Sequence, residues 1–147
     1  MGTKTKYEEI FATFKDRITD PDLITFSEDL QTELLVSIMN NALSRCQRIC
    51  NEVDLSDRDD ELLEFNVTVP YDIIEIIAEW MTVYWLKPYL NNQENLRNAL
   101  STKDFSFFSP ANLLEKIGNT YKEAFNQARS LTNEYSYIHA DFSGLQS

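Results

Sequence analysis

The stretch PYDIIEIIAEWMTVYWLKPYL, residues 70–90, decides the fold of this chain. Its first residue, Pro70, suits the first turn of a helix, and the apolar side chains that follow occupy most sides of the helical cylinder. A helix that is apolar nearly all round is buried. We therefore predict a central core helix from Tyr71 to about Tyr89, which Pro88 bends or ends.

The same helix is long enough to cross a bilayer, so a membrane span is the alternative. It carries four charged residues, however: Asp72, Glu75, Glu79 and Lys87. Each charge near a membrane centre costs about 2.5–3.5 kcal/mol, which favours a core helix in a protein without membrane contact.

Amphipathic segments with helical spacing lie on both sides of this helix. We predict a short helix over residues 4–17 and a second from near Ser27 to Ile49, where Arg45 and Arg48 fall on the solvent face. A last helix starts at Pro110 after a Ser109 cap and runs to about Tyr135. The predicted fold is an all-α, single-domain bundle of about four main helices in residues 1–135, followed by an extended C-terminal arm, residues 136–147.

Residues 51–66 form an acidic stretch in which Arg58 is the one basic residue. Ser56 is placed to cap a short helix there, and residues 66–69 are expected to be extended before Pro70. A calcium loop is the alternative, but the stretch lacks the central glycine that such a loop needs. We interpret it as a solvated acidic face.

The whole chain is acidic, with 13 Lys and Arg against 24 Asp and Glu and a formal charge of −11. Such a surface repels nucleic-acid phosphate and anionic lipid, and no basic cluster offsets it. Plain solubility is the simpler explanation of the same charge.

The two cysteines, Cys46 and Cys50, lie four residues apart in a helical pattern. A disulfide between them is sterically awkward, so free, buried thiols in a reducing compartment are expected. The first residues carry no apolar run of a signal peptide, and we expect the protein to be intracellular when it is made.

The chain has few groups suited to catalysis or to binding a metal. His139 is the only histidine, and the glycines are isolated, so neither a metal centre nor a phosphate loop is predicted. Glu75 and Glu79 stack on one helix face, with Asp72 one turn earlier. Paired carboxylates serve acid–base chemistry, but they also suit a stripe that meets water or a partner's Arg and Lys. We predict no enzymatic activity and no cofactor.

Aromatic residues are concentrated in loops and near the C-terminus, where they indicate binding to other proteins. Residues 135–142 alternate weakly and suit an arm that adds to a neighbour. Covering the core of the bundle is the alternative for both groups. The aromatic residues are Phe105, Phe107, Phe108, Tyr135, Tyr137 and Phe142.

Several phrases, taken in order, resemble the neck, or head–tail connector, proteins of long-tailed bacteriophages of Gram-positive bacteria. They are LSDRDDEL at residues 55–62 leading into FNV at 65–67, EII at 75–77, WLKP at 85–88 and KDFSFFSPAN at 103–112.

This resemblance implies a structural protein of the virion neck, assembled in the host cytoplasm. Copies would form a homo-oligomeric ring below the portal that joins the DNA-filled head to the tail. The implied partners are the portal protein, the next neck or stopper protein on the tail side, and double-stranded DNA that passes without specific binding.

Three groups of residues are the predicted sites of these contacts. The C-terminal arm would bind the portal or another partner through Tyr135, Tyr137, Ile138, Phe142 and Leu145. The channel would be lined by Asp57, Asp59, Asp60, Glu61 and Glu64. The contacts between subunits would involve Phe105, Phe107 and Phe108.

Two other functions stay open. A small acidic helical regulator or inhibitor that mimics DNA and binds a host protein would have the same composition. A stopper or tail-completion protein is the other, although stoppers are usually rich in β-structure and this pattern is helical.

Overall fold

The computed structural model describes residues 3–19, 30–50, 52–91 and 110–138. Within these ranges it has four helices and a hairpin of two short strands, so the predicted all-α bundle is confirmed. The helices are α1 (Tyr7–Arg17), α3 (Thr32–Cys46), α4 (Tyr71–Asn91) and α7 (Pro110–Ile138), and the strands are β1 (Arg58–Asp59) and β2 (Glu64–Phe65).

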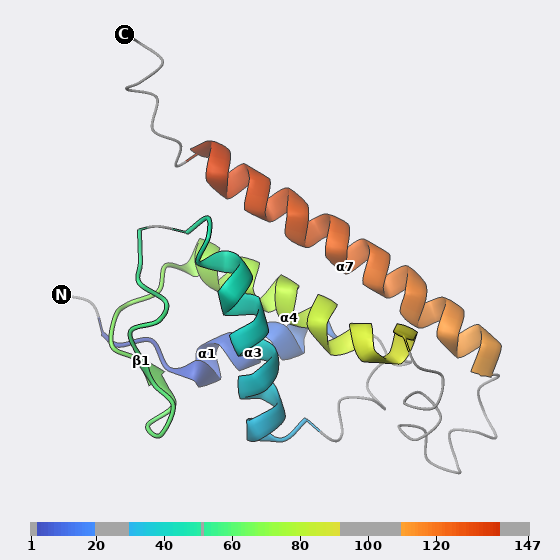
Figure 1. Cartoon of the computed structure of the whole chain (residues 1–147), viewed down its shortest axis with the longest axis horizontal. Coiled ribbons are helices and arrows are strands. Elements are labelled where there is room, and N and C mark those ends of the chain that lie inside the picture. Colours follow the sequence, from blue (N-terminus) through green and yellow to red (C-terminus); the bar gives the residue numbers. More distant parts are fainter. Residues whose placement is uncertain (1–2, 20–29, 51, 92–109, 139–147) are drawn as a thin grey trace, which may run out of the picture.

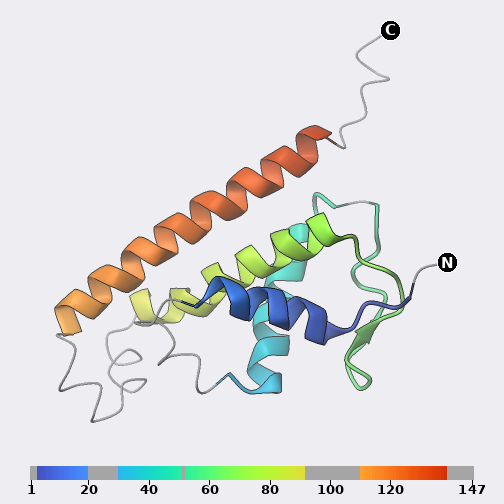
Figure 2. The same cartoon turned by 180° about the vertical axis from the view of Figure 1, so that it is seen from behind.

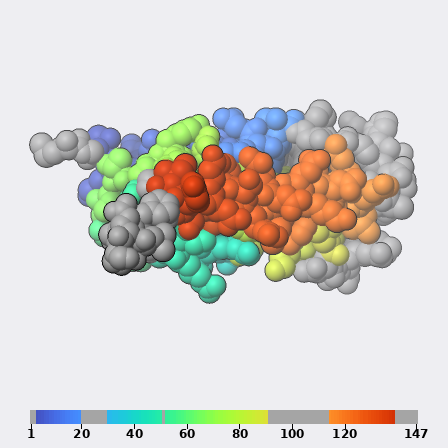
Figure 3. Space-filling view, turned by 90° about the horizontal axis from the view of Figure 1, so that it is seen from above, coloured from blue at the N-terminus to red at the C-terminus, as the bar shows by residue number. Residues whose placement is uncertain are grey.

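Helix α4 is the centre of the bundle and packs against α1, α3 and α7 (Figure 1). Seen from above, α1 and α3 lie on opposite edges of the molecule, with α7 between them (Figure 3). The view from behind shows α1 in front of α4 (Figure 2). From Ile73 to Leu86 every α4 side chain is buried except those of Glu75 and Tyr84, which are half-buried. The prediction of a central core helix is confirmed.

Pro88 does not end α4, which continues to Asn91. A proline inside a helix removes one backbone hydrogen bond and crowds the preceding turn. Tyr89 and Leu90 nevertheless pack against the core, and Leu90 lies beside Gly118 of α7. Tertiary packing of the last turn therefore outweighs the local cost of the proline.

Helix α7 begins at Pro110, as predicted, but it ends at Ile138 instead of near Tyr135. Thr132 and Tyr135 are buried against the rest of the bundle. The Trp80 indole Nε1 donates a hydrogen bond of 3.0 Å to Thr132 Oγ1, which holds this end of α7 on α4. Residues 136–138 are thus helical and not part of an extended arm. Residues 139–147 lie outside the described residues.

Helix α3 is shorter than predicted at its C-terminal end, stopping at Cys46, and the expected start near Ser27 lies outside the described residues. Gln47 gives the physical reason for this end. Its Oε1 accepts a hydrogen bond of 2.6 Å from the Leu55 amide, and its Nε2 donates one of 3.2 Å to the Val53 carbonyl. One side chain therefore satisfies the backbone of the loop that follows.

The acidic stretch is a hairpin and not the predicted short helix. Strands β1 and β2 pair antiparallel, with Arg58 opposite Phe65. The turn between them contains no glycine, and Leu63 takes the left-handed conformation with φ 54°. The hairpin pairs in turn with the chain before α1: the Phe65 amide donates to the Thr5 carbonyl (2.7 Å) and the Tyr7 amide to the Leu63 carbonyl (2.9 Å). Residues 66–70 lead into α4 without helix or strand, and the chain bends at Asn66 and Val67, where extended backbone was expected.

Candidate functional site

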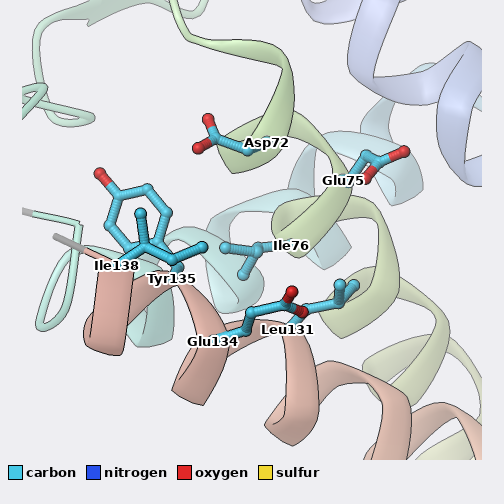
Figure 4. A pocket seen from close by; sticks show the side chains of 7 residues that line it. All are labelled: Asp72, Glu75, Ile76, Leu131, Glu134, Tyr135 and Ile138. Atoms are coloured by element: carbon cyan, nitrogen blue, oxygen red, sulfur yellow. The ribbon is translucent and has the colours of Figure 1, made fainter.

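A groove separates the first turns of α4 from the last turns of α7 (Figure 4). Its volume is about 230 Å³. Apolar side chains from both helices, Ile76, Leu131 and Ile138, lie among the carboxylates of Asp72, Glu75 and Glu134. No Lys or Arg is among the described residues that line it. The groove therefore combines apolar contact area with negative charge.

The predicted partner-binding residues of the C-terminus divide into buried and exposed ones. Tyr135 is 4% exposed, and burial raises the pKa of its phenol. Tyr137 and Ile138 are 74% and 65% exposed at the end of α7, beside the groove. Tyr135 thus anchors the helix end, whereas its two neighbours present an apolar surface. Phe142 and Leu145 lie outside the described residues, as do Phe105, Phe107 and Phe108.

The predicted channel-lining acids lie together on the hairpin, but several of their carboxylates hold the hairpin together. Asp59 Oδ1 accepts hydrogen bonds from the amides of Glu61 (2.9 Å) and Leu62 (3.1 Å) in the turn. Asp57 Oδ1 accepts from Asn66 Nδ2 at 2.9 Å. Asp59 therefore acts as a turn cap, which is the usual role of a short carboxylate next to free backbone amides, whereas Asp57 links the two sides of the hairpin through the Asn66 side chain.

The other three acids differ in their surroundings. Asp60 Oδ1 accepts a hydrogen bond of 2.5 Å from the Tyr7 hydroxyl, and burial together with Asp60 raises the pKa of Tyr7. Glu64 lies 3.9 Å from Lys4 Nζ and is half-buried, while Glu61 is exposed at the turn. The five predicted channel-lining acids therefore do not form one uniform acidic surface on the hairpin.

Arg58 organises this segment, a role that its charge alone did not signal. Its Nη1 donates to the Leu55 carbonyl (2.8 Å) and its Nη2 to Asn40 Oδ1 of α3 (3.1 Å). Its Nε lies 3.7 Å from Asp60 Oδ1. The single basic residue of the acidic stretch thereby ties the hairpin to the bundle.

A second hollow, which the sequence reasoning missed, lies between the end of α3 and α4. It has a volume of about 380 Å³ and is lined by Asn41, Ser44, Arg45, Arg48, Ile49 and Tyr84, with no carboxylate among them. Among the described residues, no ion pair involves either arginine. Arg45 lies in α3 and Arg48 just beyond its end, and their spacing in the sequence does not reveal that Tyr84 of α4 borders them.

The position of Arg45 on the polar face of the predicted helix suggested a solvated side chain, but the side chain packs against aromatic rings. Its guanidinium lies 3.9 Å from the centre of the Trp80 ring and 5.6 Å from that of Phe125. Trp80 and Phe125 meet edge to face at 5.5 Å. The arginine therefore covers the contact between α4 and α7 and keeps its charge near the surface.

The stacked glutamates of α4 face α1. Arg17 Nη1 lies 2.5 Å from Glu79 Oε2, and its Nη2 lies 3.9 Å from Glu75 Oε1. Burial raises the pKa of Glu79, and Arg17 opposes that rise. This geometry supports the interpretation of the glutamate stripe as a partner for a basic side chain, here one from the same chain.

The cysteines are free and buried, as predicted. Burial raises the pKa of Cys50 to about 11 and that of Cys46 further, so both are neutral thiols at pH about 7. The described residues include no cluster of three or more His, Cys, Asp or Glu that is arranged to hold a metal ion. Within the same ranges, none of the helices combines the length and apolar character of a membrane span.

Comparison of the chain with protein-family models, with curated proteins and with solved structures found no significant match. The resemblance to phage neck proteins therefore stays a prediction from the sequence.

Proposed function

We propose that this chain is a structural subunit of the head–tail connector of a long-tailed phage, forming a ring below the portal that joins the DNA-filled head to the tail. The observation that carries the proposal is the exposed apolar end of α7. Tyr137 and Ile138 are neighbours in the sequence and both are exposed, so the end of α7 presents apolar contact area beside a groove. Such a surface suits a protein that works by binding other proteins.

In this proposal the end of α7 docks on the portal. Tyr137 and Ile138 supply the contact and Tyr135 fixes the position of the helix end, while Phe142 and Leu145, outside the described residues, remain further predicted contacts. A rigid helix loses little conformational entropy when it binds, so it is a suitable support for a docking surface. No catalytic step, metal or cofactor is part of this function.

The acidic character of the chain suits a DNA channel, since a wall of like charge lets DNA pass without adhesion. Asp57, Asp60 and Glu61 are exposed on the hairpin and are the residues that we propose to face the channel. Asp59 and Glu64 contribute through the shape of the hairpin.

The first test is the composition of purified virions from cells infected with the phage that encodes the chain. We expect the protein to be present, with a copy number close to that of the portal protein when both are quantified by mass spectrometry. Absence from virions would refute the proposal. Salt-sensitive binding to a host DNA-binding protein would then favour the DNA-mimic alternative.

The second test concerns the docking surface. A Tyr137→Ala and Ile138→Ser double variant should fold like the wild type and fail to bind isolated portal rings in a pull-down. A matched control is Tyr71→Ala, which removes an equally exposed aromatic from the start of α4. Equal binding by the double variant and the control would contradict portal docking through α7.

A further inference from the structure

Two of the hollows in the described part of the chain have opposite charges. The acidic groove between α4 and α7 carries Asp72, Glu75 and Glu134, whereas the basic hollow at the end of α3 carries Arg45 and Arg48. Both also contain apolar surface, from Ile76 and Leu131 in the groove and from Ile49 and Tyr84 in the hollow. The groove is therefore negative and the hollow positive, and both have apolar side chains that a contact could bury.

The two hollows also lie on different sides of the bundle. Glu75, on the wall of the groove, is paired with Arg17 of α1, which places this wall on the α1 side. The basic hollow is built mainly from α3. Since α1 and α3 lie on opposite edges of the molecule (Figure 3), the groove and the hollow cannot meet within one copy.

We propose that the acidic groove of one copy receives the exposed Arg48 side chain from the basic hollow of the next copy, so that Arg48 contacts Glu134 and its neighbours while Arg45 adds positive charge beside it. The role of this contact in a ring rests on the proposed connector function. The contact adds to that function the two surfaces that would join neighbouring subunits. Two different patches on opposite edges give a head-to-tail contact, which closes into a ring when the rotation per subunit permits it.

Charge complementarity selects this occupant. DNA is excluded from the groove because phosphates and carboxylates repel. A second copy brings Arg45 and Arg48 in a hollow without carboxylates, and every copy supplies one groove and one hollow in equal numbers. Charges of this kind mainly decide which partner is accepted and how fast it associates, and salt weakens them.

The test uses charge reversal in the full-length chain. Glu134→Arg reverses one charge of the groove and Arg48→Glu reverses one charge of the hollow, and both side chains are exposed, so the fold should tolerate either change. Matched controls are Glu123→Arg on α7 and Lys87→Glu on α4, which are equally exposed and line neither hollow. Circular dichroism checks that each variant is folded, and sedimentation velocity measures association up to millimolar protein at low and high salt.

We expect the wild type to associate at low salt and to dissociate when salt is added. Each single reversal should weaken association on the order of tenfold, and the controls should not. A mixture of the Glu134→Arg and Arg48→Glu proteins should associate again, because the unchanged groove of one variant meets the unchanged hollow of the other and the two reversed surfaces match.

Three results would overturn the proposed contact: a wild type that stays monomeric under all conditions, reversals that behave like the controls, or a mixture that does not recover association. Loss of portal binding by Glu134→Arg with normal self-association would assign the groove to the portal instead. Virion composition reports on the connector function independently. A chain that is present in virions but insensitive to charge reversal refutes only the contact, whereas a chain that associates but is absent from virions refutes only the connector function.

Discussion

The pair of helices α4 and α7 and the acidic hairpin segment, residues 54–69, are held in place by different kinds of interaction. The helices are joined by a repeating apolar face, in which Trp80 and Tyr135 are almost fully buried. The hairpin segment also buries Leu55 and Phe65, but its turn and its tie to α3 depend on single polar groups, each with its own acceptor or donor, such as Arg58 and Asp59. A repeating pattern can be recognised along a sequence, but individually placed hydrogen bonds cannot.

The largest effect should come from breaking the helical side of this comparison. Trp80→Ala removes a side chain that packs against Phe125, lies under Arg45 and donates to Thr132. We expect the free energy of unfolding to fall by about 3–5 kcal/mol, which is usual when a large buried aromatic is truncated. Urea unfolding followed by far-UV circular dichroism measures this. The control Tyr71→Ala, at an exposed position, should change stability by less than about 0.5 kcal/mol.

The next effect concerns the ion pair that joins α1 to α4. Arg17→Met leaves the buried Glu79 carboxylate without its partner, and we expect a loss of about 1–3 kcal/mol at pH about 7, less than for a fully buried pair because Arg17 is partly exposed.

The same variant has a pH signature with a defined sign. Glu79 already has a raised pKa in the folded protein, and removing Arg17 raises it further. The folded state then binds the proton more tightly than the unfolded state, so stability falls as pH rises through the acid range. The destabilisation should be small at pH about 4 and full at pH about 7. A loss that does not vary with pH would show that Arg17 acts only through the packing of its side chain.

The hairpin side of the comparison should respond to removal of one cap. Asp59→Ala leaves the amides of Glu61 and Leu62 without their acceptor and should cost about 1 kcal/mol. Glu61→Ala, two residues further along the turn, serves as the control because it leaves the Asp59 carboxylate in place as the acceptor for the backbone amides. If both variants unfold alike, the turn is maintained by packing and not by the Asp59 carboxylate.

The smallest effect tests the backbone conformation at Leu63. Comparing Leu63→Gly with Leu63→Ala removes the side chain in both variants, so their difference isolates the left-handed φ of 54°. We expect the Gly variant to be more stable by roughly 0.5–1 kcal/mol. The control is residue 12 in α1, where the wild type already has Ala, so the wild type is compared with Ala12→Gly. Here we expect the Gly variant to be less stable by about 1 kcal/mol. Equal stability of the two Leu63 variants would mean that the turn relaxes.

Helices are the part of this molecule that the residues alone predicted well. Pro70 and the apolar run after it specified α4, and Pro110 marked the start of α7. The errors have local causes. Of the two outcomes expected at Pro88, a bend or an end of the helix, the end is wrong, because packing continues α4 to Asn91. The weak alternation after Tyr135 suggested an arm, whereas burial of Thr132 and Tyr135 prolongs the helix.

The candidate site was predicted in part. Tyr137 and Ile138 were named in advance, and the carboxylates of Asp72 and Glu75 were singled out on α4. Asp72 and Glu75 line one groove together with Glu134 of α7, and this depends on how two helices far apart in the sequence are aligned. Arg48 was assigned to the polar face without any sign that it borders a hollow with Tyr84.

The sequence by itself determined the fold class, because apolar spacing dictates which helix faces must leave water. It also determined the acidic charge. Only the tertiary structure decided which acids are turn caps, which arginine covers an aromatic contact, and where opposite charges lie on opposite sides. Those features depend on the distances between residues remote in the chain, and such distances arise only when the helices pack.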